Sequence, residues 1–262
     1  MCIVNFDISR VLKQWEFNPA EPMVRRFKGK DGVEKIQLRL DLGLLQMNTC
    51  GRPDGKRPHD HESLLDHYQT RLARHVRSHE GSDDGYQLKA DDCAQLQLEA
   101  IQYHHRYLCL FQLGDFAGVI RDTDRNLEVF DFLDRYAEND EITWGLQHLR
   151  PQLMMIRTRA LGNQSLRAGR VNRAVKQIEN GVEEIRRFIQ HNELTDLADE
   201  CEEIESLQDW LKEVRSRRPL SKREKLERAM SEAVQREDYE KAAHLRDALR
   251  SLKAPAKKAH AR

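Results

Sequence analysis

Cysteine is scarce in this sequence, and its five residues are scattered without a CxxC pair. This spacing argues against a disulfide scaffold and against a zinc ribbon, because both need closely spaced cysteines. No serine or cysteine nucleophile can be paired with a general base from the sequence. We therefore predict no catalytic residues, no cofactor and a protein that is not an enzyme.

The sequence also lacks long apolar runs and a net charge. It has no run of about 18 apolar residues, the length that crosses a bilayer, and its start, MCIVNFDISRVLKQ, lacks the basic and apolar parts of a signal peptide. We expect a cytoplasmic protein with no membrane partner. The 44 Lys and Arg residues balance 44 Asp and Glu residues, so the formal charge is zero.

What the chain does contain is typical of a soluble, helix-rich protein, with 39% hydrophobic and 34% charged residues. We predict a mainly α fold with a small α/β module at its N-terminal end. The expected regions are the α/β module at residues 1–85, a helical-repeat region at 90–215, a helical hairpin at 219–252 and a basic tail at 253–262.

The predicted hairpin at residues 219–252 is the most informative segment. Apolar residues recur at helical spacing on both sides of an acidic turn. Ser221 and Glu224 form a capping box that begins the first helix, and Asp238 can cap the second. Isolated helices of about 12 to 15 residues are marginal in water. We therefore expect the apolar side of this hairpin to dock on another macromolecule or on the rest of the chain.

The run AVQREDYEKAAHLRD, from Ala233 to Asp247, resembles the UVR motif. That motif is named for the excision-repair subunits UvrB and UvrC, and it also occurs in some Clp chaperones and in protein arginine kinase activators. In this family the motif is a helical hairpin that pairs with another hairpin and joins two proteins. A generic tetratricopeptide-type hairpin has a similar turn and is the alternative interpretation.

The resemblance implies an adaptor or regulatory protein. Its partner would be a repair nuclease subunit, a Clp-type chaperone, a kinase or a second copy of this chain. The kinase activators carry cysteine pairs that are absent here, which argues against an identical role. Arg246 and Asp247 are expected to contribute to the register of docking. The predicted protein-binding residues are Leu226, Met230, Val234, Tyr239, Ala242, Leu245, Arg246 and Leu249.

The middle of the chain resembles tetratricopeptide-like helical repeats. The run LGDF at residues 113–116 matches the turn between the two helices of such a repeat, and Gly169 matches a second turn, with Gly181 at the following helix crossing. The two turn glycines are 55 residues apart, against about 34 in a regular array. We expect two to three antiparallel helix pairs that are irregular or carry an insertion at 136–145. Pro151 is expected in the first turn of its helix.

The N-terminal module is predicted to contain a β-hairpin. Lys30, Asp31 and Gly32 lie between two extended segments, which is a hairpin signal. Apolar residues alternate with polar ones from 36 to 42, as in a strand with one buried face. A short helix at 7–15 and a polar helix at 62–79 complete the expected module.

Basic residues in this module leave nucleic-acid binding as an alternative function, for example in a DNA-repair accessory protein. The isoelectric point near 7.2 is low for a dedicated nucleic-acid binder. We favour the interpretation that the charges keep an edge strand from pairing with other chains. The candidate nucleic-acid-binding residues are Arg25, Arg26, Lys28, Arg52, Lys56 and Arg57.

Two further patterns are weak. Five histidines lie between His59 and His79, and His75 and His79 would share one helix face, but no HExxH arrangement is present. We expect no metal site. The loop GRPDGKR at 51–57 is one residue short of a phosphate loop and has Arg in place of the magnesium-binding hydroxyl.

Overall fold

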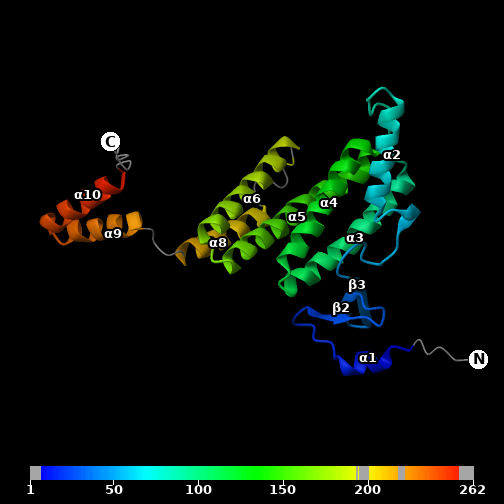
Figure 1. Ribbon diagram of the computed structural model, residues 1–262, viewed down its shortest axis with the longest axis horizontal. Helices are drawn as coiled ribbons and strands as arrows, with labels where there is room; N and C mark the ends of the chain where they lie inside the picture. Colours follow the sequence, from blue (N-terminus) through cyan, green and yellow to red (C-terminus); the bar gives the residue numbers. More distant parts are fainter. Residues whose placement is uncertain (1–6, 193, 195–200, 218–221, 254–262) are drawn as a thin grey trace, which may run out of the picture. The chain divides into compact units, whose positions relative to one another are not determined.

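The computed structural model describes residues 7–192, 194, 201–217 and 222–253, with the backbone alone at 140–142, 222–224 and 251–253 (Figure 1). Its residues form two compact units, 1–212 and 213–262, which are described separately. The fold is mainly α, as predicted, with one small antiparallel sheet. Within the described ranges, no helix is both long and apolar enough to cross a membrane.

Long antiparallel helices form most of the first unit. Neighbouring helices pack in chain order, α3 on α4, α4 on α5 and α5 on α6 (Figure 1). The apolar faces of α3, α4 and α5 build one core that also takes in the sheet. The helices of this array are α3 (Ala90–Gln112), α4 (Phe116–Tyr136), α5 (Asp140–Arg167) and α6 (Val171–His191), followed by α8 (Glu202–Ser216), whose residues up to Lys212 belong to this unit.

The two predicted turns lie where the sequence placed them. Gly114 has a φ of +69° and is followed by Asp115, whose side chain accepts a hydrogen bond from the amide of Gly118 and caps α4. Gly169, with the same φ, separates α5 from α6. Positive φ strains residues that carry a Cβ, so glycine suits both positions. The wide spacing of the turns arises because α4 and α5 have 21 and 28 residues.

Of the two alternatives for the wide spacing, an insertion at 136–145 is ruled out, because α4 runs to Tyr136 and α5 begins at Asp140. One expectation for this region is wrong. Pro151 lies inside α5 and not in its first turn. A proline in a helix interior removes one backbone hydrogen bond. The packing of α5 against both α4 and α6 outweighs that loss.

The N-terminal module contains a three-stranded meander in which β2 is central. The predicted hairpin is present, with the amide of Gly29 donating to the carbonyl of Val33 across the turn. The extended run does not continue to Leu42, which is 88% exposed in a second turn, and a third strand follows. The elements of the module are α1 (Ser9–Gln14), β1 (Met23–Lys28), β2 (Glu34–Leu40), β3 (Gly43–Asn48), the 3-10 helix Pro58–Asp60 and α2 (Leu64–Ser78).

Both faces of this sheet are covered. Ile36 and Met47 are buried on the face that joins the helical core. On the opposite face Arg39 is also buried, and its Nε donates to the carbonyl of Trp15 at 2.8 Å. The guanidinium of Arg25 lies over the Trp15 ring, 4.2 Å from its centroid. The segment after α1 thus covers the second face of the sheet. The alternating pattern predicted a strand with only one buried face, and that expectation is wrong.

Candidate protein-docking hairpin and the other predicted sites

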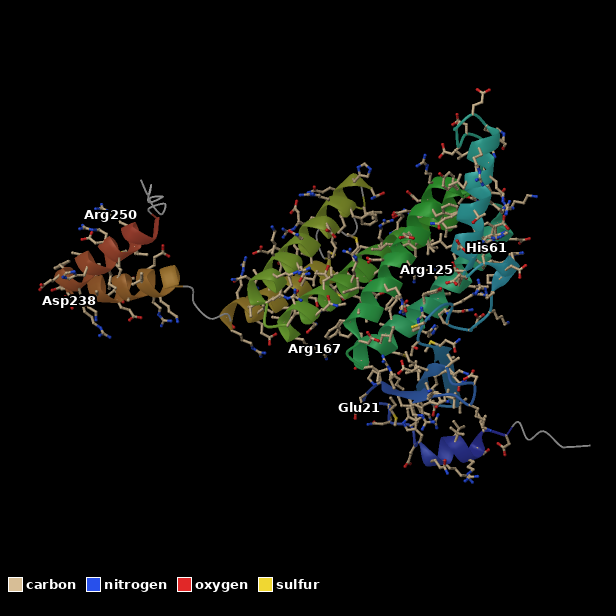
Figure 2. All side chains as sticks on the ribbon, viewed as in Figure 1. Glu21, His61, Arg125, Arg167, Asp238 and Arg250 are labelled. Atoms are coloured by element: carbon tan, nitrogen blue, oxygen red, sulfur yellow. The ribbon has the colours of Figure 1, made fainter. Side chains whose placement is uncertain are left out.

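The second unit contains the predicted hairpin, formed by α9 (Lys222–Gln235) and α10 (Tyr239–Lys253). The two helices pack against each other (Figure 1). Figure 2 shows Asp238 at the turn between them and Arg250 on α10. The expected capping box lies outside the described residues at Ser221, as does the tail beyond residue 253.

The turn of the hairpin has the geometry of a Schellman motif. The amide of Asp238 donates to the carbonyl of Ala233 at 2.9 Å, and the amide of Glu237 donates to that of Val234 at 3.0 Å. The carboxylate of Asp238 then accepts a hydrogen bond from the amide of Lys241 at 3.1 Å, which confirms Asp238 as the cap of α10. Glu237 has a φ of +59°, where glycine is the usual residue.

Replacing Glu237 by glycine should therefore stabilise the hairpin by about 1 kcal/mol, because it removes left-handed backbone strain. Hydrogen exchange of the α9 and α10 amides in the full chain measures this as slower local opening. Gln235→Gly is the matched control, because the same residue inside the helix should speed exchange. Faster exchange in Glu237→Gly would show that the carboxylate, and not the backbone, determines the stability of the turn.

Small residues occupy the contact between the two helices. Ala233 and Ala242 are buried, and alanine side chains let two helices approach closely. Ala242, predicted to bind a partner, therefore lies within the hairpin itself. Such an interior contributes little hydrophobic free energy, since each buried methylene is worth only about 0.8 kcal/mol.

The larger apolar side chains remain accessible to different degrees. Val234 is 50% exposed and Tyr239 is 68% exposed, both at the end of the hairpin that carries the turn. Arg246 and Asp247 are exposed and form an ion pair with each other at 3.3 Å. Four of the predicted binding residues are half-buried, namely Leu226, Met230, Leu245 and Leu249.

Two of the candidate nucleic-acid-binding arginines form ion pairs that link the module to the helical array. Arg26 forms ion pairs with Glu34 at 3.4 Å and with Asp115 at 2.8 Å. Arg52 is largely buried, and its Nε lies 3.0 Å from a carboxylate oxygen of Glu99. These side chains hold the module onto the helical array.

The other basic candidates are closer to solvent. Lys28 and Lys56 are exposed, and Arg57 forms a surface ion pair with Glu62 at 3.7 Å. Arg25, on the face covered by the segment after α1, also donates through its Nε to the side chain of Gln37 at 2.8 Å. The exposed positive charge of the module is thus smaller than its sequence suggests.

The structure reveals a buried charged cluster that the sequence did not predict. Arg106 is almost fully buried and forms a two-point contact with Asp122, at 2.6 and 2.8 Å. Its remaining nitrogen donates to the carbonyls of Asn48 and Gly51, at 3.1 and 2.6 Å. One arginine therefore joins α3, α4 and the loop after β3.

Glu99 organises the second half of this buried charged cluster. Its carboxylate accepts a hydrogen bond from the amide of Leu64 at the start of α2, at 2.8 Å, and pairs with Arg125 on α4. The Arg125 guanidinium lies 4.1 Å from the centroid of Tyr103. Burial lowers the pKa of Arg125 from its ordinary value. The only sequence signal was a charged residue at a core position of an apolar helix.

The histidines after residue 58 form stacked pairs. His59 stacks on His67 with 4.2 Å between ring centroids, and Nδ1 of His61 lies 3.0 Å from a carboxylate oxygen of Asp66. His75 and His79 share a helix face, as predicted, and stack at 3.8 Å. The pKa of His67 is lowered mainly by burial and, to a smaller extent, by repulsion from His59. Among the described residues, no three His, Cys, Asp or Glu side chains are arranged to hold a metal ion.

Three of the cysteines are inaccessible. Burial raises the pKa of Cys93 and Cys201 and brings that of Cys109 to about 12. They are protonated at neutral pH, and a protonated thiol is a weak nucleophile.

Comparison with known protein families identifies the hairpin. The model of the UvrB/uvrC motif, UVR, matches residues 221–254, a segment that begins one residue before α9 and ends one residue after α10. No curated protein and no solved structure matches the chain. In UvrB- and UvrC-type proteins the motif is associated with interaction with protein or DNA. The helical hairpin of α9 and α10 is therefore a UVR motif, and this chain is a UVR-motif-containing protein.

Proposed function

We propose that this chain is a non-enzymatic adaptor or regulatory protein whose UVR hairpin docks a partner protein. The observation that best supports this proposal is the distribution of apolar side chains in α9 and α10. The alanines are inside the hairpin, whereas Val234 and Tyr239 are at least half exposed. A hairpin whose interior is built from alanine keeps its larger side chains available for another surface.

The mechanism is helix-against-helix recognition. The exposed Val234 and the half-buried Met230 and Leu245 supply apolar area, and full burial of a large aliphatic side chain gives about 1.5 to 3 kcal/mol. Arg246 and Asp247 can exchange their mutual ion pair for charges on the partner, which sets register more than affinity. The partner is a second helical hairpin, carried by a repair nuclease subunit, a Clp-type chaperone, a kinase or another copy of this chain.

Val234→Asp is the variant that tests this function. It places a charge on the exposed side of α9 without entering the alanine interior, so we expect the hairpin to stay folded and partner capture to fall at least about tenfold. Affinity purification of the full chain from its native cell, quantified by mass spectrometry, measures the loss.

Gln235→Asp is the matched control, because it adds the same charge at the neighbouring exposed position. Capture should be close to that of the unchanged chain. Undiminished capture by Val234→Asp, with exchange protection of α9 and α10 intact, would show that a different surface binds the partner. Leu245→Asp is less informative, since Leu245 is half-buried and its replacement also weakens the hairpin.

The alternative function, nucleic-acid binding through the N-terminal module, has less support. Arg26 and Arg52 already neutralise carboxylates of their own unit, so they are poorly placed to neutralise phosphates. Lys28 and Lys56 remain as exposed charges, with Arg57 in a surface ion pair. Three such side chains give a weak dependence of affinity on salt, because the slope follows the number of phosphates neutralised.

A further inference from the structure

Helix α3 has an exposed face without formal charge. Between Cys93 and Leu113 its only Asp, Glu, Lys or Arg residues are Glu99 and Arg106, and both are buried. In a chain with 34% charged residues, a solvent-facing surface of this length normally carries several charges. A contact with another macromolecule accounts for this composition, because the centres of such contacts are poor in charged residues.

Large apolar side chains lie on the same face. Leu98, Ile101 and Leu108 are 64%, 50% and 40% exposed, and their spacing of three and seven residues places them on one side of the helix. They form a ridge about 15 Å long, at 1.5 Å per residue. Several exposed apolar side chains along one helix face mark an interaction site more often than isolated exposed leucines do.

A hollow of about 620 Å³ lies beside this ridge, between α3, α4 and α5. Its wall carries no charged side chain, and its polar groups are amides, His104 and the hydroxyl of Tyr107. His104 and Tyr107 are hydrogen-bonded to each other at 2.6 Å, so they offer little to a polar ligand. On α5, Leu149 lines the hollow and is 53% exposed, and Trp144, outside the lining, is 66% exposed. The apolar surface therefore extends outside the hollow on both sides.

We propose that this surface, the ridge of α3 and the adjoining hollow, is the interface of a two-fold dimer with a second copy of the chain. In such a dimer each patch meets its own copy, so any charge near the axis faces a like charge. A face without charge avoids that repulsion. A ridge beside a hollow is also self-complementary, since the ridge of each copy enters the hollow of the other.

The extent of the surface favours a second copy over a small molecule. A compound in the hollow would leave Leu98 and Leu108 in water, because neither residue lines the hollow. The absence of charge in turn argues against a partner that is recognised through ion pairs. This dimer uses the first unit and does not depend on the UVR hairpin.

Sedimentation velocity of the full chain tests the proposal. In the Val234→Asp background, which should weaken any pairing through the hairpin, the chain should still sediment as a dimer. Adding Ile101→Glu should weaken the dimer at least about hundredfold, because it places a glutamate of each copy in an apolar interface. Leu42→Glu is the matched control, since Leu42 is exposed in a turn of the sheet, and it should leave the dimer intact.

Circular dichroism and thermal unfolding must show that Ile101→Glu is folded, as expected for a half-exposed position. If that variant unfolds, Leu98→Gln replaces it, with at least about tenfold weaker association expected. A monomer in the Val234→Asp background at all concentrations, or a dimer that persists in both α3 variants, would overturn the proposal. A monomer with a copurifying compound in native mass spectrometry would assign the hollow to a ligand instead.

Discussion

Replacing Arg106 by methionine should destabilise the first unit by about 3 to 5 kcal/mol, the typical cost of removing one partner from a buried ion pair. The change leaves the Asp122 carboxylate buried without its two-point partner. It also removes the donor that serves the carbonyls of Asn48 and Gly51. Urea unfolding of the full chain, followed by tryptophan fluorescence, measures the change in free energy of unfolding.

A second variant separates the loss of the pair from the loss of packing. Arg106→Met with Asp122→Leu removes both charges, and replacing both partners of a buried pair is often near neutral. We expect this double variant to recover most of the lost stability. Arg121→Ala is the surface control, because Arg121 also contacts Asp122 but is nearly half exposed, and it should cost at most about 1 kcal/mol. Equal losses in all three variants would contradict a specific role for Arg106.

The features predicted correctly from the sequence depend on local conformation. Gly114 and Gly169 stand at positive φ in turns between helices, and glycine is the residue that enters this region without strain. Asp238 caps the helix that follows it. A turn or a cap is determined by a few neighbouring residues, so one sequence is enough to place it.

The features that were missed depend on residues far apart in the chain. Arg106 meets the carbonyl of Asn48 across 58 positions, and no periodicity in either segment indicates that contact. The second face of the sheet is buried because the carbonyl of Trp15 accepts from Arg39, which an alternating strand pattern does not reveal. Pro151 was predicted in the first turn of a helix because proline locally favours that position. In the structure it lies inside α5, where packing against the neighbouring helices stabilises the helix.

The candidate docking site was predicted in part for the same reason. Its two helices and its turn follow from spacing and capping, and the UVR match covers them. The division into a buried Ala242, a half-buried Leu245 and an exposed Val234 depends on where the helices cross. An apolar stripe has a width of more than 100° on a helix, so the sequence alone does not say which edge of the stripe stays open.

The second large effect on stability is expected for Gly181→Ala, at the crossing of α5 and α6. A Cβ at position 181 would overlap the side chain of Thr158, whose own Cβ would lie only 2.8 Å away. Forcing extra volume into a packed contact costs about 1 to 3 kcal/mol, against a gain of about 1 kcal/mol that alanine brings to a helix interior. Because the overlap involves three atoms of Thr158, urea unfolding should show a net destabilisation of up to about 2 kcal/mol.

The same substitution at Gly145 should have the opposite sign. Nothing lies within 4 Å of a Cβ at that position, so Gly145→Ala should stabilise α5 by up to about 1 kcal/mol. Thr158→Ala removes the hydroxyl and methyl that meet the new Cβ, and in the Gly181→Ala background it should return more than half of the lost stability. If the two changes at 158 and 181 are simply additive, the helices do not cross at this pair. The predicted role of Gly181 as the small residue at a crossing would then be wrong.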